Sequence, residues 1–230
     1  MGVRIGVGWC SSFDRPLAQR LHGYRPYRRL RYAYRAPSLF LQGMLRAGAD
    51  VEFVEFDGDF GTDDLVSRPG RPIDVLYVAS HGMSRPDGYR LALHETDWRL
   101  ALPFGVDGPT VAVFDTCFLV NRDDRTWWQP WLAGLGPSLR LVLGFSSFAT
   151  VGERQSERGA AFARDLTTMP FVAAWCAAVG HTSYPETDEP VAIAFGDDAA
   201  DASHVMETAS VGSLPPPRTG AIPVVAWWPR

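Results

Sequence analysis

Two residues with reactive side chains, His81 and Cys117, each follow a short run of apolar residues. Residues 73–80 read Ile-Asp-Val-Leu-Tyr-Val-Ala-Ser and lead directly into His81, and residues 110–114 read Thr-Val-Ala-Val-Phe and end shortly before Cys117. A free thiol is mostly protonated at neutral pH, and a neighbouring imidazole can take its proton or hold it as a thiolate. A histidine beside a cysteine is therefore a suitable pair for nucleophilic attack on a carbonyl.

The two apolar runs must supply the elements that bring these side chains together. Runs this short and this apolar are typical of strands in a parallel sheet whose two faces are both covered. In such a sheet the carboxyl ends of the strands share one edge, where open α/β folds place their sites. The sequence therefore predicts an α/β fold, a three-layer sandwich with a mostly parallel central sheet flanked by helices, in which His81 and Cys117 lie side by side.

Two backbone amides near this pair are candidates for holding an oxyanion. Gly82 follows His81 and has no side chain, so its N–H has free access to the same space. Together with the N–H of Cys117 it would meet the negative charge that develops on a carbonyl oxygen under attack. We therefore expect Gly82 to belong to the catalytic group.

The pattern of a strand ending in His-Gly, followed by a second strand ending in acidic-x-Cys, resembles the caspase/hemoglobinase clan of cysteine peptidases. The resemblance implies that His81 is the base, Gly82 an oxyanion donor and Cys117 the nucleophile, and that Asp115 helps to bind a basic substrate side chain. Residues 118–120 read Phe-Leu-Val, where clan members usually carry a small residue after the cysteine. Residues 141–147 and a helical segment ending near 175 are similar to an uncharacterised family of stand-alone bacterial caspase-like domains.

Other residues that follow predicted strands are expected at the same edge. The first strand, residues 3–8, leads into Trp9 and Cys10, and the strand at 139–145 leads into Ser146 and Ser147. We expect these four residues, with Trp98 as a wall, to line a substrate cleft. For Cys10 the alternative is an ordinary buried thiol, and for Trp98 it is ordinary core packing.

Composition limits the chemistry and the partners. The chain has 230 residues, enough for one α/β domain, and its net charge of -4 argues against a general nucleic-acid binder. All 22 basic residues are arginines, which excludes a Schiff-base lysine or a P-loop lysine. The three cysteines fit neither a disulfide framework nor a zinc site, and no run approaches the roughly 18 apolar residues of a membrane span. We therefore expect a cytoplasmic protein without metal, cofactor or membrane partner.

The remaining elements are predicted from local patterns. We expect a helix over 37–48 that Ser38 caps, a strand at 51–56, a surface connection over 57–70 and a polar stretch over 83–97. Further segments are a short helix after residue 123, helices over 153–169 and after Pro170, a strand at 191–195, and a Pro-rich connection at 215–217 before an edge strand at 224–228. The arginine- and tyrosine-rich residues 15–35 either bind anions or bases, or pack as a tyrosine-anchored loop or helix.

Three functions remain open from the sequence. The first is a cysteine hydrolase that cleaves an amide or ester bond of a peptide or small molecule through Cys117 and His81. The second is a biosynthetic enzyme in which His81 and Asp115 act as acid and base in a cyclisation or rearrangement. The third is a non-catalytic caspase-like binding module. The sequence leaves the oligomeric state open.

Overall fold

The computed structural model describes most of the chain. The described residues are 2–13, 29–61, 72–85, 88–94, 97–99, 108–119, 136–183, 187–220 and 224–228. The arginine- and tyrosine-rich stretch lies largely outside them, as does the helix predicted after residue 123. The elements, in chain order, are β1 (Arg4–Trp9), α2 (Arg35–Arg46), β2 (Asp50–Phe56), the 3-10 turn η1 (Asp57–Asp59), β3 (Val75–Ala79), β4 (Gly82–Arg85), β5 (Gly88–Ala92), β6 (Asp97–Arg99), β7 (Val111–Asp115), β8 (Leu141–Phe145), the 3-10 turn η2 (Gln155–Glu157), α5 (Arg158–Asp165), α6 (Phe171–Thr182), β9 (Pro190–Gly196), α7 (Ala199–Thr208) and β10 (Val224–Trp228).

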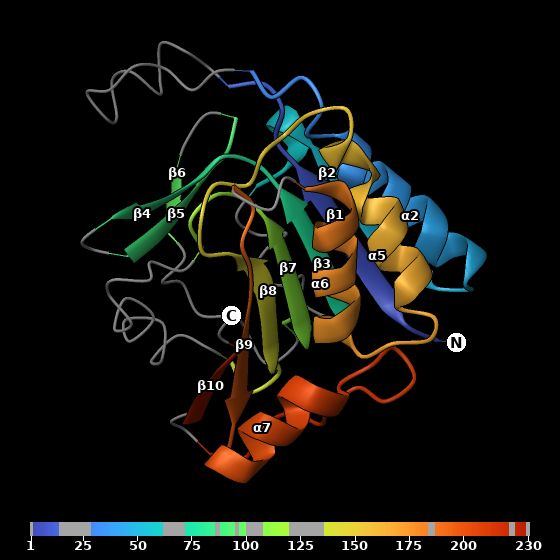
Figure 1. Cartoon of the computed structure of the whole chain (residues 1–230), viewed down its shortest axis with the longest axis vertical. Coiled ribbons are helices and arrows are strands. Elements are labelled where there is room, and N and C mark those ends of the chain that lie inside the picture. Colours follow the sequence, from blue (N-terminus) through green and yellow to red (C-terminus); the bar gives the residue numbers. More distant parts are fainter. Residues whose placement is uncertain are drawn as a thin grey trace.

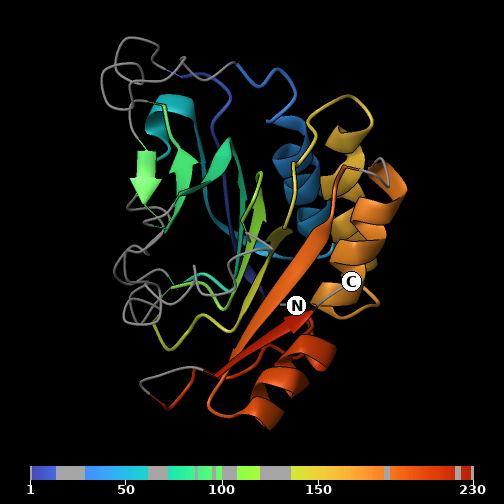
Figure 2. The same ribbon diagram turned by 60° about the vertical axis from the view of Figure 1, so that its left-hand side comes forward.

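A seven-stranded sheet in the order β10-β9-β8-β7-β3-β1-β2 forms the centre of the fold. All neighbouring pairs from β2 to β8 are parallel, and only β9 runs against its two neighbours. Figure 1 shows α2, α5 and α6 on one side of this sheet and the small antiparallel sheet β4-β5-β6 on the other, and Figure 2 confirms it from a second direction. The α/β class and the mostly parallel, helix-flanked sheet are confirmed.

The alternation of side chains along the strands divides the core in two. Val75, Tyr77 and Ala79 of β3 face the helices and join a cluster that includes Phe40, Phe162 and Trp175. The residues between them, Leu76 and Val78, join a second cluster on the opposite face, which β5 and neighbouring segments cover with Leu91, Leu93, Phe60 and Leu119. Because both faces of β3 are buried, the strand needs apolar side chains at every position, as its sequence indicated.

Three local expectations were wrong. The helix α2 begins at Arg35, two residues before the predicted start, and the Ser38 hydroxyl donates to Tyr34 O within the first turn, 2.6 Å away, instead of capping the helix. The residues predicted as the polar stretch 83–97 contribute to strands β4, β5 and β6, and the tail contains a further helix, α7, whose N-cap Asp198 accepts from Asp201 N. The edge strand over 224–228 is confirmed as β10, which pairs antiparallel with β9.

Helices α2 and α5 approach each other closely because small residues stand where they cross. A Cβ atom built on Gly159 would lie 1.8 Å from Ala36 O, and one on Gly43 would lie 2.5 Å from Ala163 Cβ. The first contact is with backbone, which cannot rotate away. Glycine at position 159 is therefore required by the packing of α5 on α2.

We predict that Gly159→Ala lowers the free energy of unfolding by about 3 kcal/mol or more, because the added methyl group has to push two helices apart. The matched control is Gly180→Ala in α6, where no atom lies within 4 Å of the added carbon. That change should be neutral or stabilise the protein by up to about 1 kcal/mol through helix propensity. Urea unfolding followed by circular dichroism measures both, and equal stabilities for the two variants would contradict the packing argument.

Candidate active site

The carboxyl edge of the sheet, meaning the residues that directly follow β1, β3, β7 and β8, contains the predicted reactive side chains. Ala79 of β3 pairs with Asp115 of β7 in parallel register, so His81 and Cys117 each come two residues after a paired position on neighbouring strands. Both residues are partly exposed. The structure therefore places the two candidate residues on adjacent strand ends.

The thiol of Cys117 lies against the segment that follows β8. Ala149 N donates to Cys117 Sγ over 3.3 Å, and Sγ lies 3.7 Å from Ala149 O. Burial raises the pKa of this thiol, the Ala149 amide opposes the rise, and the carboxylates of Asp115 and Asp188 add to it. The resting thiol is therefore protonated at neutral pH, and a base has to remove its proton during attack.

The backbone after Cys117 adopts an uncommon conformation. Phe118 has φ of 51°, in the left-handed region that residues with side chains rarely occupy, and its N–H donates to Ser147 O over 2.8 Å. Such conformations cost about 1 to 3 kcal/mol and concentrate at functional sites. The sharp turn sets Cys117 apart from an ordinary core cysteine at a strand end.

His81 is held by contacts on both sides. Its ring lies 5.2 Å from the ring of Phe13, centroid to centroid, and its carbonyl accepts from Ala92 N over 2.9 Å. That bond makes 81 and 92 a hydrogen-bonded pair of the antiparallel ladder, so at the next pair, Gly82 and Leu91, the N–H of Gly82 points away from β5. The predicted oxyanion donor therefore faces away from its own hairpin.

Asp115 lies below the edge in a buried ionic cluster. Its carboxylate accepts from Tyr77 Oη over 2.9 Å and forms an ion pair with Arg158, which also binds Asp188 over 3.0 Å. Burial and the Asp115 charge raise the pKa of Tyr77 well above its ordinary value, so the phenol stays a donor. These internal bonds engage both oxygens of Asp115, and no local sequence pattern pointed to Arg158 as their partner.

Two residues after β1 were predicted to contact substrate, and the structure separates them. Cys10 has 0% exposure, its Sγ donates to Ser12 O over 3.2 Å, and burial raises its pKa to about 12. The expectation that Cys10 lines a cleft is therefore corrected to the alternative, a buried thiol. Trp9 remains partly exposed and stacks on Phe56, with ring centroids 5.2 Å apart.

The serines after β8 are tied to the segment before β9. Ser146 Oγ donates to Glu189 over 3.1 Å, and Ser147 Oγ donates to Thr187 O over 2.6 Å and accepts from Glu189 N over 2.8 Å. Both are partly exposed at the carboxyl edge, as expected from their position. Trp98 is in β6, opposite Leu91 of β5, so its backbone belongs to the small sheet.

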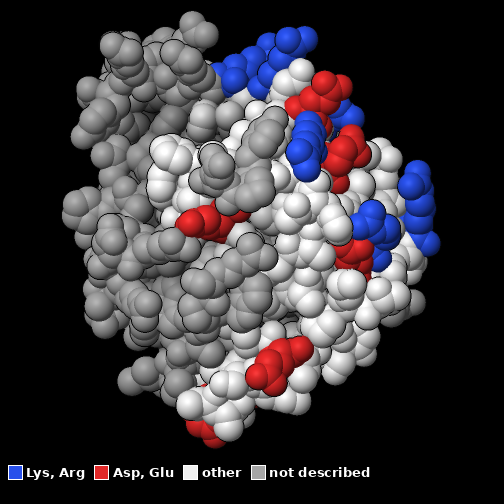
Figure 3. All heavy atoms as spheres, in the orientation of Figure 1, with Lys and Arg blue, Asp and Glu red and all other residues white. Residues whose placement is uncertain are grey.

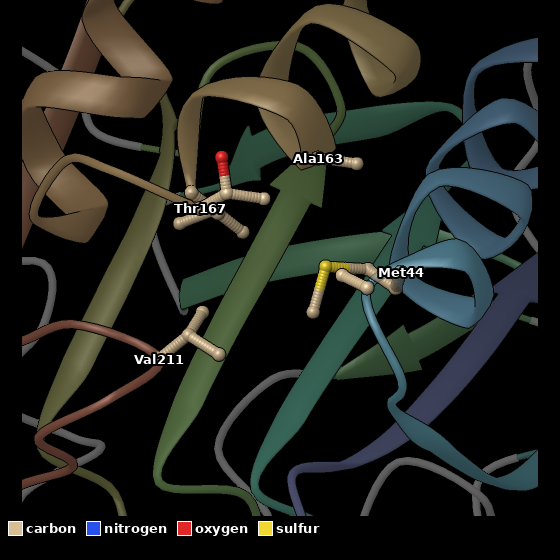
Figure 4. A pocket seen from close by; sticks show the side chains of 6 residues that line it. Met44, Ala163, Thr167 and Val211 are labelled. Atoms are coloured by element: carbon tan, nitrogen blue, oxygen red, sulfur yellow. The ribbon is translucent and has the colours of Figure 1, made fainter. Parts of the chain in front are cut away.

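Other features of the described residues lie apart from the pair. No group of three or more His, Cys, Asp or Glu side chains in the described segments is placed to hold a metal ion, and no described helix is long and apolar enough to cross a bilayer. An apolar hollow of about 200 Å³ lies between Met44, Ala163, Thr167 and Val211 (Figure 4). Since Met44 is near the end of α2, next to the start of β2, the hollow lies toward the amino edge of the sheet.

The pKa of Cys117 leads to a prediction about its reaction with iodoacetamide. Because only the thiolate reacts, and the thiol pKa is raised, the rate of alkylation should rise about tenfold per pH unit between about pH 7 and 9. Peptide mass spectrometry distinguishes Cys117 from Cys176, which is also partly exposed, and Cys10 should remain unlabelled until the protein unfolds. A rate at Cys117 that is flat across this range would indicate a preformed thiolate and contradict the assignment.

The geometry of the carboxyl edge is the basis for any functional conclusion. The chain matches no protein-family model, and a search of curated proteins finds no significant match. Cys117, His81 and the groups around them are therefore the features of the chain that bear on its function.

Proposed function

We propose that the protein is a caspase-like cysteine hydrolase that cleaves an amide or ester bond through Cys117 and His81. The observation that carries the proposal is the register of β3 and β7, in which Ala79 faces Asp115 and both reactive residues follow two positions later. The partial exposure of both side chains and the turn at Phe118 support it. The resemblance to caspase-like peptidases is further support, because the order along the chain, with His-Gly after one strand and acidic-x-Cys after a later one, is the same.

In the proposed reaction His81 acts as a general base and then as an acid. It takes the Cys117 proton while Sγ attacks the carbonyl carbon, and the amides of Gly82 and Cys117 hold the developing oxyanion. The bond to the leaving group breaks, and His81 returns the proton to that group. Water, activated by the same imidazole, then releases the acyl group from sulfur. General-base transfer at the moment of attack fits a thiol whose pKa is raised at rest.

The substrate group nearest to Cys117 is proposed to be apolar. Phe148 is 63% exposed and meets the ring of Phe118 edge-on, with centroids 4.5 Å apart, and the two residues are the chain neighbours of Ala149 and Cys117, whose N–H and thiol are in contact. Asp115 has both oxygens engaged by internal partners, so the described geometry offers less support for the basic side chain that the family resemblance implied.

An ester with a good leaving group tests the dyad without knowledge of the natural substrate. With p-nitrophenyl acetate we expect a burst of one nitrophenolate per chain and an acetyl group on Cys117, detected by mass spectrometry. Cys117→Ala should abolish the burst, and His81→Ala should slow it by about 10²-fold or more. Cys176→Ser is the control and should match the wild type. Equal bursts in the wild type and His81→Ala would refute the proposed base.

A second candidate function is a cyclisation or rearrangement of a small natural-product intermediate. The aromatic pair of Phe118 and Phe148 favours it, because it offers an apolar surface beside a thiol that is protonated at rest. In this reaction the acid–base work falls to His81, and the sulfur forms no covalent bond to the substrate.

Replacing Cys117 with serine distinguishes the two functions. If the protein is a hydrolase, Cys117→Ser and His81→Ala, each introduced into the organism that encodes the protein, should remove the same products from its small-molecule extract, because serine at this position lacks the reactivity of the thiol. If it catalyses a rearrangement, Cys117→Ser should leave the products within about twofold of the wild type while His81→Ala removes them. Comparative mass spectrometry of the extracts is the measurement, and unchanged products in both variants would contradict both reactions.

A further inference from the structure

A chain of hydrogen bonds leads from the Cys117 thiol into the interior. Ala149, whose N–H donates to Sγ, is followed by Thr150, and both the N–H and the Oγ1 of Thr150 donate to Asp188, over 2.9 and 2.7 Å. The other oxygen of Asp188 binds Arg158 over 3.0 Å. The position of the amide at the sulfur therefore depends on a carboxylate that a single arginine holds.

Arg158 is itself fixed by several elements at once. It is the first residue of α5, and its guanidinium also forms an ion pair with Asp115 at the end of β7, donates to Ser183 Oγ over 3.0 Å and lies 4.7 Å above the ring of Phe145. Its side chain is 1% exposed, and Nε is buried without a hydrogen-bond partner in the described part of the chain. These contacts fix the conformation of the Arg158 side chain and, with it, the positions of the carboxylates of Asp115 and Asp188.

We propose that Arg158 is a positioning residue for Cys117, which holds the Ala149 N–H against the sulfur through Asp188 and Thr150. The assignment rests on the proposed function only in taking Cys117 as the reacting thiol. The new element is that Arg158, which does not contact the sulfur, influences the pH at which the Cys117 thiol ionises. A lysine in the same place would keep the charge but lose the planar fork that binds two carboxylates in fixed directions.

The charged and titratable groups around the thiol set the direction of the effect. Asp115 from β7 and Asp188 before β9 act on the thiol directly, Arg158 from α5 and Tyr77 from β3 are bonded to these carboxylates, and His81 lies at the neighbouring strand end after β3. The Ala149 amide stabilises the thiolate, and the two carboxylates destabilise it. Loss of Arg158 frees the Ala149 segment and leaves both carboxylates without their shared cation, so both consequences raise the pH at which the thiol ionises.

A pH series of iodoacetamide alkylation at Cys117 measures this without any turnover. In Arg158→Met we expect the midpoint to move up by about one pH unit, which lowers the rate near pH 8 about tenfold while the limiting rate at high pH is kept. Arg158→Lys should recover part of the shift. The matched control is Arg140→Met, which removes an equally buried arginine, 2% exposed and bonded to Asp201 over 2.7 Å, at the opposite edge of the sheet.

The control variant should keep the wild-type midpoint within about 0.3 pH units, equivalent to a twofold change in thiolate. The proposal is overturned if folded Arg158→Met also keeps it, or if Arg140→Met shifts it equally. Where Arg158→Met does not fold, the same comparison of Arg158→Lys with Arg140→Lys decides. The expected rise of the alkylation midpoint in Arg158→Met, together with no acyl-enzyme when the wild type reacts with p-nitrophenyl acetate, would support the positioning role and refute the hydrolase. The two proposals therefore fail separately.

Discussion

The parallel pairing of β3 with β7 is the constraint on which the candidate site depends. Both strands are buried over their whole length, and their side chains alternate between the helix face and the opposite face. A slip of one residue would exchange the two faces and move every core side chain of the strand. The packing of the core therefore fixes the register, and the register fixes which residues leave the sheet next to each other. The packing of the hydrophobic core therefore determines that His81 and Cys117 follow the ends of adjacent strands.

Charge below the carboxyl edge opposes the reaction that the edge is proposed to perform. Asp115 and Asp188 share one guanidinium, so the buried cluster carries more negative than positive charge. Breaking such a cluster by removing one partner is costly, whereas its net contribution to stability is small because the charges have lost their hydration. Burial, with the negative charge of this cluster as a smaller contribution, raises the pKa of the Cys117 thiol and keeps it protonated, so in the proposed reaction activation falls to the imidazole of His81.

At the opposite edge of the sheet, hydrogen bonds and an ion pair fix α7 and the segment before β10 in place. Arg140 donates to Phe195 O over 2.9 Å and binds Asp201 at the start of α7, while Asp197 accepts from the N–H and hydroxyl of Thr219 and from Gly220 N. These bonds hold the pKa of Asp197 at about 2 and fasten the segment that precedes β10.

On the face shown in Figure 3, acidic and basic side chains of the described residues are interspersed where α2 and α5 lie, and pairs such as Arg35 with Glu157 account for part of this pattern.

Local patterns in the sequence determined the buried strands and the residues at their ends. The runs before His81, Cys117 and Ser146 are almost entirely apolar because both faces of their strands are covered, and that property needs no knowledge of the partners. The strands predicted at 51–56 and 224–228 were likewise visible, as was the helix after Pro170. The polar segment that forms β4 to β6 was missed because its strands form a separate small sheet and lack the continuous apolar run of the central strands.

Tertiary structure decided what surrounds the thiol. Cys10 is buried although it follows a strand just as Cys117 does, and local sequence does not show this difference in solvent access. The bond from Ala149 to Cys117 and the ion pairs of Arg158 with two carboxylates join residues that are remote in the chain. Arg158 is one of 22 basic residues, and no local pattern distinguishes it from the others. The sequence by itself determined which side chains reach the carboxyl edge, because strand ends follow from local hydrophobicity. Only the packed structure decided which charges lie beneath them, because burial and ion pairing are properties of several segments together.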